Sequence, residues 1–308
     1  MTLFSLIIAL LIEQVRPLPV DRLVLAPLRA LSRSLVRRFN DGQVHHGRLA
    51  WALVVVPGTV LVAIAYYLLW GLHPVFAFLF NVAVLHLTMG FRHESHFFTD
   101  IHLALRMGEI DRARSLLGEW RGGQYLDASS SEVARLAIEQ ALVAAHRNVF
   151  GVALWFVILP GPGGAVMYRL ARFLADDWGR RQDAEFGDFG AFARRAFALI
   201  DWLPARLTAG SFSVAGNFED AISCWRTQAV LWPDKSSAIL IASGGGALGV
   251  RLGMPIRESG EIVDRPEMGQ GDEADADHMQ GTVGLIWRAL LVCFFLLALV
   301  GLAGWVSG

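Results

Sequence analysis

The sequence has few lysines, cysteines and charged residues. Among its 308 residues, Lys235 is the only lysine, and Cys224 and Cys293 are the only cysteines. Two cysteines without a nearby partner argue against a disulfide framework and a zinc knuckle. Charged residues make up 18% of the chain, and the formal net charge of −1 gives no attraction to nucleic acid. The sequence also lacks a nucleophile elbow, a Ser-His-Asp spacing and a dinucleotide fingerprint, so no nucleic-acid partner and no common soluble-enzyme chemistry are expected.

Long apolar runs are present instead. Residues 49–72 and 285–306 are nearly uninterrupted apolar stretches, and 54% of the chain is hydrophobic. About twenty apolar residues match the roughly 30 Å hydrocarbon core of a bilayer. The apolar segment 2–14 lacks a basic start and a small-residue cleavage site, so we expect a retained membrane-inserted helix. The sequence therefore predicts an all-α, polytopic integral membrane helical bundle.

The remaining segments predict amphipathic helices around this bundle. An arginine-rich stretch at 14–48 is typical of a helix on the membrane surface. Residues 75–91 form a helical hairpin with 49–72, and 149–175 predict a broken helix pair interrupted at 160–164. The positive-inside rule places the arginine-rich segments in the cytoplasm, which makes 92–147 and 176–283 largely cytosolic-facing. We expect one domain over 1–308, with the acidic stretch 257–278 as a solvated loop.

Three local patterns have chemical interest. His93, His96 and Asp100 share a helix face that suits a metal, but histidines that make interfacial hydrogen bonds are commoner, and no metal site is assigned. Asp201 and Arg206 stand in an apolar segment and predict either an ion pair or a ligand site; Pro204 between them would start or kink a helix.

The third pattern is the glycine-rich run 243–253, which contains Arg251. Its backbone amides and the arginine suit an anion, whereas its small side chains suit close helix packing. The Lys-Ser/Thr ending of a Walker motif is missing. Both interpretations stay open on the residues alone.

Several segments resemble one family of membrane proteins. DWLPARLTA (201–209), WRTQAVLWPDKSSAILIASGGGALGVRLGMP (225–255) and the stretch 264–289 are similar to the C-terminal half of the CobD/CbiB family. The opening MTLFSLIIALLIEQ and the arginines after it look more like AmpE relatives of the same superfamily. The resemblance implies an inner-membrane, multi-pass protein with cytoplasmic basic loops.

Some residues of this sequence match family motifs, and some acidic residues of the family are missing here. Arg226, Asp234, Ser236 and Ser237 fall in one family motif, and residues 246–253 match its Gly-Ala-Leu-Gly motif well. Other positions fall on family motifs only in part: Glu139, Asn148, Asp201, Pro204, Ala205 and Arg206. Family acids are missing at Gly122 and Phe150, which weakens the implied catalysis more than the implied fold.

The family implies amide condensation of adenosylcobyric acid with an aminopropanol phosphate at the cytosolic membrane face. It implies a corrinoid substrate, contact with membrane lipid and a divalent cation such as Mg²⁺. The implied catalytic residues are Asp201 and Glu139. The implied substrate-binding residues are Arg206, Arg226, Ser236, Ser237, Gly249, Arg251 and Asn148. The alternative is a non-catalytic AmpE-like sensor tied to β-lactamase induction, and no oligomeric state is predicted.

Overall fold

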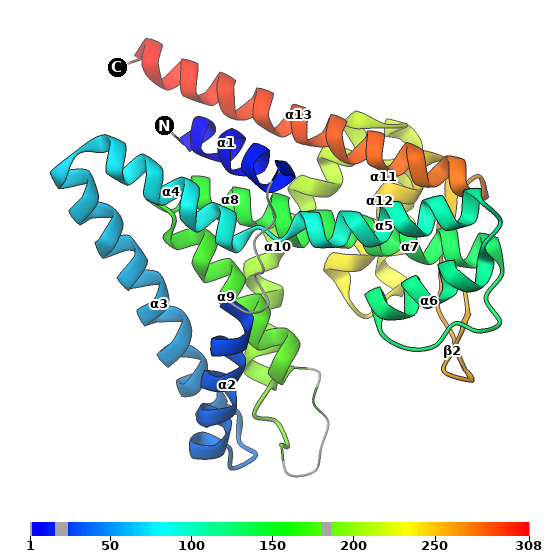
Figure 1. Cartoon of the computed structure of the whole chain (residues 1–308), viewed down its shortest axis with the longest axis horizontal. Helices are drawn as coiled ribbons and strands as arrows, with labels where there is room; N and C mark the ends of the chain where they lie inside the picture. The colour runs from blue at the N-terminus through cyan, green and yellow to red at the C-terminus, as the bar shows by residue number, and fades with distance from the viewer. Residues whose placement is uncertain (1, 16–23, 180, 182–185, 308) are drawn as a thin grey trace. The chain divides into compact units, whose positions relative to one another are not determined.

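Helices make up most of the chain (Figure 1). The structure is a computed structural model that describes residues 2–15, 24–179, 181 and 186–307. The chain divides into two compact units, each built from two stretches of sequence. The first unit comprises Met1–Gly90 and Gly151–Leu203, and the second comprises Phe91–Phe150 and Pro204–Gly308. The expectation of one domain over 1–308 is not tested by this division and stays a prediction.

The first unit is helical throughout its described part. Its helices are α1 (Thr2–Val15), α2 (Ala26–Phe39), α3 (Val44–Leu72), α4 (Pro74–Thr88), α8 (Gly151–Ile158), α9 (Gly163–Trp178) and the first part of α10 (Ala191–Ala215). Its core gathers around Trp178, whose ring is fully buried 5.2 Å from that of Phe189. The Trp178 indole N–H donates to the hydroxyl of Ser32 at 2.7 Å, which fixes α2 against α9.

Helix α2 has the predicted amphipathic character. Its arginines are exposed, and the buried Ser32 lies on the opposite side. The exposed arginines are Arg29, Arg33, Arg37 and Arg38. Arg16 and Arg22 of the same predicted segment lie outside the described residues. Contact of this basic face with lipid phosphates stays a prediction.

Among the residues that the structure describes, three helices are long and apolar enough to cross a membrane: Val44–Leu72, Ser130–Ile158 and Ala276–Ala303. Only 11% of the apolar window of α3 is buried within the protein, against 61% for Ser130–Ile158. Apolar side chains that the protein does not cover need another apolar environment, so α3 exposes a lipid-facing surface while Ser130–Ile158 is mostly enclosed. The predicted all-α membrane fold class is confirmed. The orientation of the basic segments stays a prediction.

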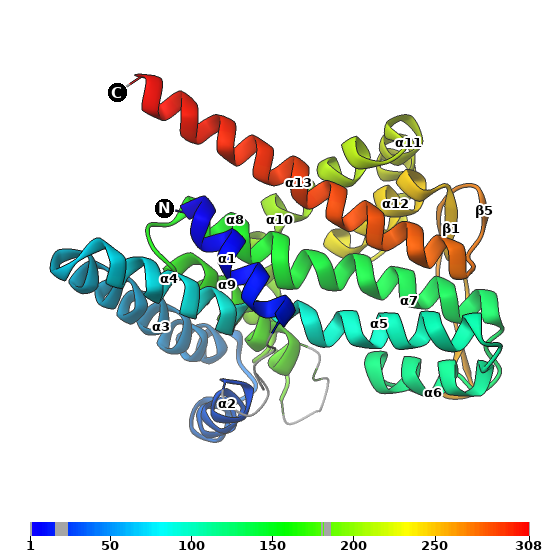
Figure 2. The same cartoon turned by 45° about the horizontal axis from the view of Figure 1, so that its top comes forward.

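The second unit is built around a buried helix. Its helices are α5 (Phe91–Arg106), α6 (Ile110–Arg121), α7 (Ser130–Ala145), the rest of α10, α11 (Phe218–Gln228), α12 (Lys235–Leu248) and α13 (Ala276–Ser307). Figure 2 shows α5, α6 and α7 side by side. Helix α7 begins at a capping box formed by Ser129 and Glu132, and nearly all of its side chains from Val133 onward are buried.

A small β structure replaces the predicted solvated loop over part of 257–278. Strand β1 (Val250–Gly253) pairs antiparallel with β4 (Glu267–Gly269) and parallel with β5 (Asp272–Glu273). Strands β2 (Ile256–Glu258) and β3 (Glu261–Val263) form a separate hairpin. The prediction of a loop was wrong for these residues. Backbone pairing of β4 and β5 with β1, and of β2 with β3, orders a stretch whose side chains are mostly exposed and polar.

Pro204 lies inside α10 and does not begin a helix. A proline cannot donate to the carbonyl four residues earlier, which here belongs to Ile200. The indole N–H of Trp155 donates to that carbonyl at 3.1 Å. A side chain from α8 therefore supplies the hydrogen bond that the proline removes.

Candidate functional site

Most of the predicted site residues lie in the second unit. That unit contains Glu139, Asn148, Arg206, Arg226, Ser236, Ser237, Gly249 and Arg251. Asp201 belongs to the first unit by the same division. Some of these residues belong to two clusters, one around Glu139 and one around Asp234.

Glu139 is the centre of the first cluster. Its side chain is buried on α7, and both carboxylate oxygens have partners. Arg265 donates to one oxygen at 2.8 Å and to the other at 3.2 Å. The backbone N–H of Gly253 donates to the carboxylate at 2.9 Å. The predicted glutamate and the last glycine of the glycine-rich run are thus in direct contact.

The backbone beside Glu139 has an unusual conformation that suits this contact. Gly253 has φ +71°, and a Cβ there would come within 2.1 Å of the Pro266 carbonyl oxygen. The next residue, Met254, also has a positive φ, 62°. A non-glycine side chain at 253 would therefore be excluded by both sterics and backbone strain.

Arg265 was not selected from the sequence. It lies between β3 and β4, and it also donates to the carbonyl oxygens of Gly253 and Met254 at 2.9 and 3.1 Å. Its guanidinium stacks over the Trp232 ring at 5.2 Å from the centroid. The signal was available, because Arg265 stands in the 264–289 segment that carries the family resemblance. The carboxylates around Arg265, however, are typical of a solvated loop, so the sequence alone does not indicate a role for this arginine.

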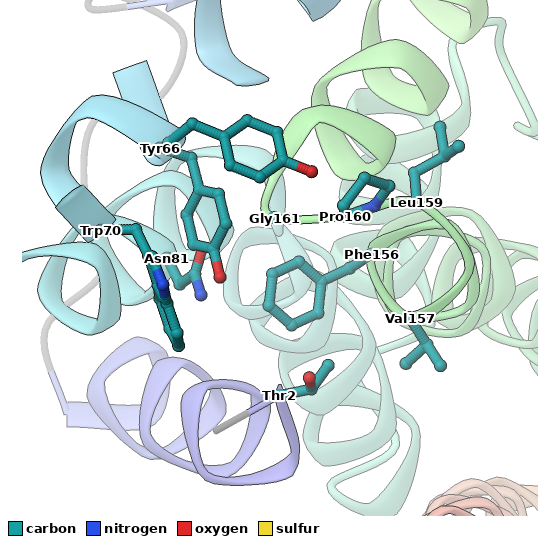
Figure 3. Close-up of a pocket in the computed structure, with 10 residues that line it drawn as sticks. Thr2, Tyr66, Trp70, Asn81, Phe156, Val157, Leu159, Pro160 and Gly161 are labelled. Carbon is teal, nitrogen blue, oxygen red and sulfur yellow. The ribbon is translucent and has the colours of Figure 1, made fainter. Parts of the chain in front are cut away.

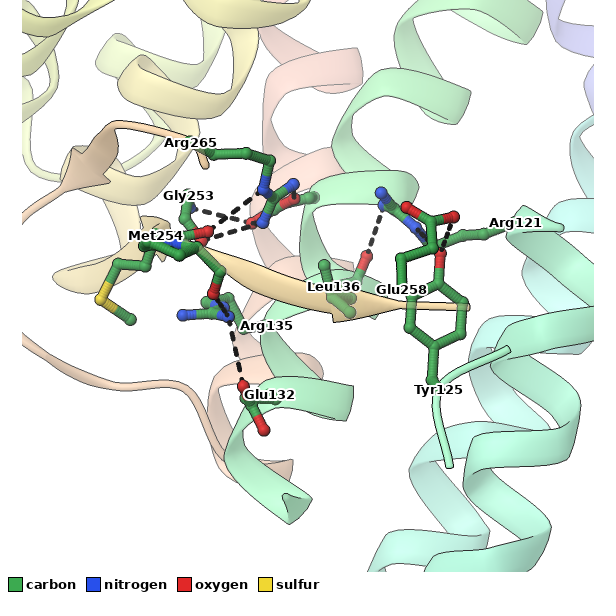
Figure 4. A network of polar contacts seen from close by, with 11 residues as sticks. Arg121, Tyr125, Glu132, Arg135, Leu136, Gly253, Met254, Glu258 and Arg265 are labelled. Atoms are coloured by element: carbon green, nitrogen blue, oxygen red, sulfur yellow. Dashed lines mark hydrogen bonds and ion pairs between the residues drawn. The ribbon is translucent and has the colours of Figure 1, made fainter. Parts of the chain in front are cut away.

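Arg135 adds a second buried cation, one turn from Glu139 on α7. Its side chain is 5% exposed and lies 3.9 Å from Glu132, and it donates to the Pro255 carbonyl at 3.4 Å. Its Nε atom has no hydrogen-bond partner among the described residues. Figure 4 shows Arg135 and Arg265 on opposite sides of the backbone at Gly253 and Met254. Arg135 and Arg265 are paired with Glu132 and Glu139, so the charges of this cluster balance. The unpaired Nε of Arg135 is the cationic donor that remains for an anion.

A cavity of about 270 Å³ lies beside this cluster, and Glu132, Leu136 and Pro255 contribute to its lining. The Tyr125 hydroxyl, at the same cavity, donates to Glu258 at 2.9 Å and accepts from Arg121 at 3.4 Å (Figure 4). Burial raises the pKa of Tyr125 above its usual value. The phenol therefore stays protonated and serves as a hydrogen-bond donor.

The second cluster surrounds the start of α12. Asp234 caps this helix, and its carboxylate accepts from the Ser237 hydroxyl at 2.6 Å. Arg147 donates to both side chains at 3.3 Å. The predicted Ser237 hydroxyl therefore lies between the Asp234 carboxylate and the Arg147 guanidinium. Ser236 is half-buried in the first turn of the helix.

Asn148 follows Arg147 within a π-helical turn, His146–Phe150. A π turn inserts one extra residue into a helix and is frequent at functional sites. Asn148 is buried, and the neighbouring His146 ring nitrogen lies 2.9 Å from the Thr208 hydroxyl. The predicted Asn148 is thus the next residue in the sequence after Arg147, which forms an ion pair with Asp234.

Gly249 and Arg251 lie where α12 meets the sheet. Gly249 ends the helix in the left-handed conformation with φ +69°, and its carbonyl accepts from the Asp272 N–H at 3.0 Å. Arg251 is half-buried, and its guanidinium is 3.6 Å from Glu273. Gln228 holds the neighbouring strand through two hydrogen bonds to the backbone of Gly269, at 2.7 and 2.9 Å.

The other predicted residues lie apart from these clusters. Arg226 is exposed in the last turn of α11. Arg206 is half-buried on α10, and burial lowers the pKa of its guanidinium. Asp201 is buried in the first unit, where it accepts a hydrogen bond from the Tyr168 hydroxyl at 2.7 Å.

The described residues offer poor ligands for the expected cation. Among them, no group of three His, Cys, Asp or Glu side chains could hold a metal ion. Both oxygens of Glu139 already accept hydrogen bonds from Arg265. His96, from the histidine pattern, accepts from Arg92 at 3.2 Å. These residues do not fit a resident Mg²⁺. The divalent cation that the resemblance implies stays a prediction.

Comparison with known proteins identifies the family. The model described as CobD/Cbib protein matches residues 4–286. The chain belongs to the CobD/CbiB family. It is similar to the cobalamin biosynthesis protein CobD of Stutzerimonas stutzeri (strain A1501), with 33% identity over 98% of each chain. It is also similar to the cobalamin biosynthesis protein CobD of Chromobacterium violaceum, with 32% identity over 79% of this chain and 76% of that protein.

A more distant CobD/CbiB relative is the cobalamin biosynthesis protein CbiB of Salmonella typhimurium, with 26% identity over 88% of each chain. No solved structure matches the chain. The family match begins at residue 4 and so includes the N-terminal segment that resembles AmpE proteins. These comparisons do not support the AmpE-like alternative.

Proposed function

We propose that this chain acts in cobalamin biosynthesis by joining the carboxyl group of adenosylcobyric acid to the amine of an aminopropanol phosphate. The proposal draws on the names of its relatives, which are cobalamin biosynthesis proteins. The observation that carries it within the structure is the buried cluster of Arg135, Arg265 and Glu139. Each proposed substrate carries an acidic group, and the buried Nε of Arg135, which has no partner among the described residues, is a cationic donor for such a group.

The cavity beside the cluster suits the smaller substrate. Asp127 and Glu132 line it with carboxylates, and Arg257 lines it with a guanidinium. An aminopropanol phosphate has an amine that carboxylates recognise and a phosphate that arginines recognise. The unused Nε of Arg135, close behind Pro255, is a further donor for that phosphate.

Glu139 acts as a positioning residue in this proposal. Its carboxylate holds Arg265 and the Gly253 backbone, which leaves it little capacity to accept a proton from the amine. Arg251, Arg226 and Arg206 are the proposed contacts for phosphate or propionate groups of the larger substrate. The catalytic role of Asp201 stays a prediction.

Amide formation joins the amine nitrogen to the carboxyl carbon, and one carboxyl oxygen must leave. Because hydroxide is a poor leaving group, the proposed reaction needs a phosphoryl donor as co-substrate, and the oxygen leaves as phosphate while the amine gives up its protons. The amine must be uncharged to attack, and the carboxyl carbon must be made electrophilic. Asp127 and Glu132 are the groups placed to take the amine proton, and an arginine would stabilise the developing oxyanion. The membrane helices would confine the reaction to the proposed cytosolic face.

Complementation tests the proposal. The gene is supplied to a strain that lacks its own adenosylcobinamide-phosphate synthase, and growth that depends on corrinoid assembly is measured with extracted corrinoids. We expect the wild-type chain to restore adenosylcobinamide phosphate. Arg135→Gln should abolish the rescue, and Arg112→Gln, an exposed arginine on α6 paired with Glu109, should preserve it.

The proposal is wrong if the wild-type chain reaches the membrane in normal amount and no adenosylcobinamide phosphate forms. If Arg135→Gln and Arg112→Gln rescue equally well, the assignment of the site to the Arg135 cluster is wrong. Immunodetection in the membrane fraction separates loss of activity from loss of protein.

A further inference from the structure

The first unit contains an aromatic cavity that the proposed reaction does not use. It measures about 260 Å³ and is lined from α3 by Tyr66, Tyr67 and Trp70, from α4 by Asn81 and from α8 by Phe156. Figure 3 shows Tyr66, Trp70, Asn81 and Phe156 around one space beside Pro160 and Gly161. The Tyr66 ring lies 5.5 Å from that of Tyr67 and 6.0 Å from that of Trp70.

A buried amide in this cavity has an unused acceptor. Asn81 is 4% exposed, and its Oδ1 atom has no hydrogen-bond partner among the described residues. The other end of the amide lies beside the Tyr66 hydroxyl. An unsatisfied buried carbonyl is costly, so a ligand that brings an N–H or O–H donor would be stabilised here.

The lining excludes one class of ligand and favours another. None of the ten lining residues that the structure describes carries a charge, so an isolated phosphate or carboxylate would find no counter-ion. Aromatic ring faces carry negative electrostatic potential and attract an ammonium group. Aromatic rings together with a carbonyl acceptor suit a cation that also donates hydrogen bonds.

The position along α3 places the cavity at the level of lipid headgroups. Helix α3 has 29 residues and is therefore about 43 Å long, which exceeds the roughly 30 Å hydrocarbon core. The two tyrosines and the tryptophan lie in its last two turns, where an aromatic belt marks the membrane interface. Tyr67 and Trp70 are largely exposed, which leaves the cavity open toward that interface.

We propose that this cavity binds the ammonium headgroup of a phosphatidylethanolamine molecule. The primary ammonium donates to Asn81 Oδ1 and lies against the aromatic rings, while the phosphate and the acyl chains remain outside along the apolar face of α3. Gly161 keeps the cavity in shape: it has φ +67°, and a Cβ there would lie 2.6 Å from the Tyr66 ring.

Lipid retention by the full-length protein tests this site. The chain is reconstituted in vesicles of equal parts phosphatidylethanolamine, phosphatidylcholine and phosphatidylglycerol, extracted in mild detergent and analysed by native mass spectrometry. Phosphatidylcholine has a cationic quaternary ammonium group but no N–H to donate, and phosphatidylglycerol offers hydroxyl donors without an ammonium group. We expect phosphatidylethanolamine to be retained about fivefold or more above both.

Variants show whether this cavity is the cause of the selective lipid retention. Asn81→Leu should reduce retention of phosphatidylethanolamine to the level of phosphatidylcholine, and Trp70→Leu should reduce it as well. Trp70 is 45% exposed, so its replacement keeps the fold even where the buried Asn81→Leu does not. The control is Trp287→Leu, an equally exposed tryptophan on α13, and it should retain wild-type selectivity.

Equal retention of the three lipids, or preference for phosphatidylglycerol, would overturn the proposal. Selective retention that survives both Asn81→Leu and Trp70→Leu would also overturn it, because the lipid would then be bound elsewhere. These outcomes are independent of corrinoid synthesis, which the complementation experiment measures.

Discussion

Glu139 and Arg265 form a buried, two-pronged ion pair across 126 residues of sequence, with N–O distances of 2.8 and 3.2 Å. The pair joins the largely buried helix α7 to the segment between β3 and β4. Because Arg265 also holds the carbonyls of Gly253 and Met254, it fixes the end of the glycine-rich run next to the proposed active site.

Removal of Arg265 should destabilise the protein strongly. In Arg265→Gln the buried Glu139 loses its cation, and removal of one partner of a buried pair typically costs about 3–5 kcal/mol. The control is Arg257→Gln, which removes an exposed pair with Asp127 and should cost less than about 1 kcal/mol. Denaturant unfolding in detergent micelles, followed by circular dichroism, measures both.

The double variant Glu139→Gln/Arg265→Gln separates the ion pair from other contacts of Arg265. It should recover part of the loss because no uncompensated buried charge remains. Equal costs for Arg265→Gln and Arg257→Gln would show that the pair is not the feature that holds this region together.

Arg251 should affect substrate binding more than folding. Its guanidinium is half-buried beside Glu273, and a charge-assisted hydrogen bond to a phosphate or carboxylate is worth about 1.5–3 kcal/mol. Arg251→Gln should therefore raise the KM of one substrate by about tenfold or more and leave the other KM unchanged. Arg251→Lys keeps the charge but loses the forked donors, so we expect an intermediate value.

Steady-state kinetics with membranes that contain the variants measure these constants. Arg112→Gln is the matched control, since that arginine is exposed and distant in the chain from the proposed site. If Arg251→Gln lowers kcat alone, or if it behaves like Arg112→Gln, Arg251 does not bind substrate.

The sequence was sufficient where local composition decides the structure. The apolar run 49–72 predicted a membrane helix, and α3 covers it from Val44 to Leu72. The break at 160–164 also has a local cause, and α8 ends at Ile158 before α9 begins at Gly163. Length, apolarity and Pro-Gly content are readable within a single window.

The candidate site could not be predicted from any short stretch of sequence, because it depends on contacts between residues far apart in the chain. Arg265 stands among acidic residues that are typical of a solvated loop, and only its long-range pairing with Glu139 shows its role. Strand β1 has four residues and strand β5 has two, which is too short for an alternating pattern to be recognised. The glycine-rich run packs as buried helix up to residue 248, as one of the two interpretations predicted. The Gly253 N–H donates to the protein's own Glu139, and binding of an external anion stays a prediction.

Trp155 should stabilise α10 through the carbonyl that Pro204 leaves unpaired. Trp155→Phe keeps an aromatic ring but removes the donor to Ile200, so we expect a loss of about 1 kcal/mol in the free energy of unfolding. In the Pro204→Ala background the backbone N–H of residue 204 can bond this carbonyl, and the same substitution should cost less. Unfolding in detergent micelles for the four proteins of this cycle gives the coupling energy.

Trp287→Phe, at an exposed tryptophan on α13, is the control and should stay within about 0.5 kcal/mol of wild type. A Trp155→Phe cost that is the same with proline and with alanine at 204 would show that the indole N–H does not compensate for the proline.

Asp275 should make the stability of the second unit depend on pH on the acid side. Its carboxylate accepts from the backbone N–H of His278 at 2.8 Å at the start of α13. This hydrogen bond, and then the His278 side chain, lower the pKa of Asp275 below its usual value. A lowered pKa stabilises the folded state above the unfolded-state pKa of about 3.8–3.9, and this stabilisation is lost as the pH falls through the folded-state pKa.

Asp275→Asn tests this sign, because asparagine caps a helix about as well as aspartate and carries no charge. We expect the variant to match wild type closely at pH 7 in thermal unfolding, and to lose less stability than wild type between pH 5 and pH 3. Asp275→Ala should lose about 1 kcal/mol at pH 7 because it removes the cap itself, and this difference from wild type should shrink toward pH 3 as the wild-type carboxylate is protonated. Parallel pH profiles for wild type and Asp275→Asn would show that the charge of Asp275 contributes nothing to the start of α13.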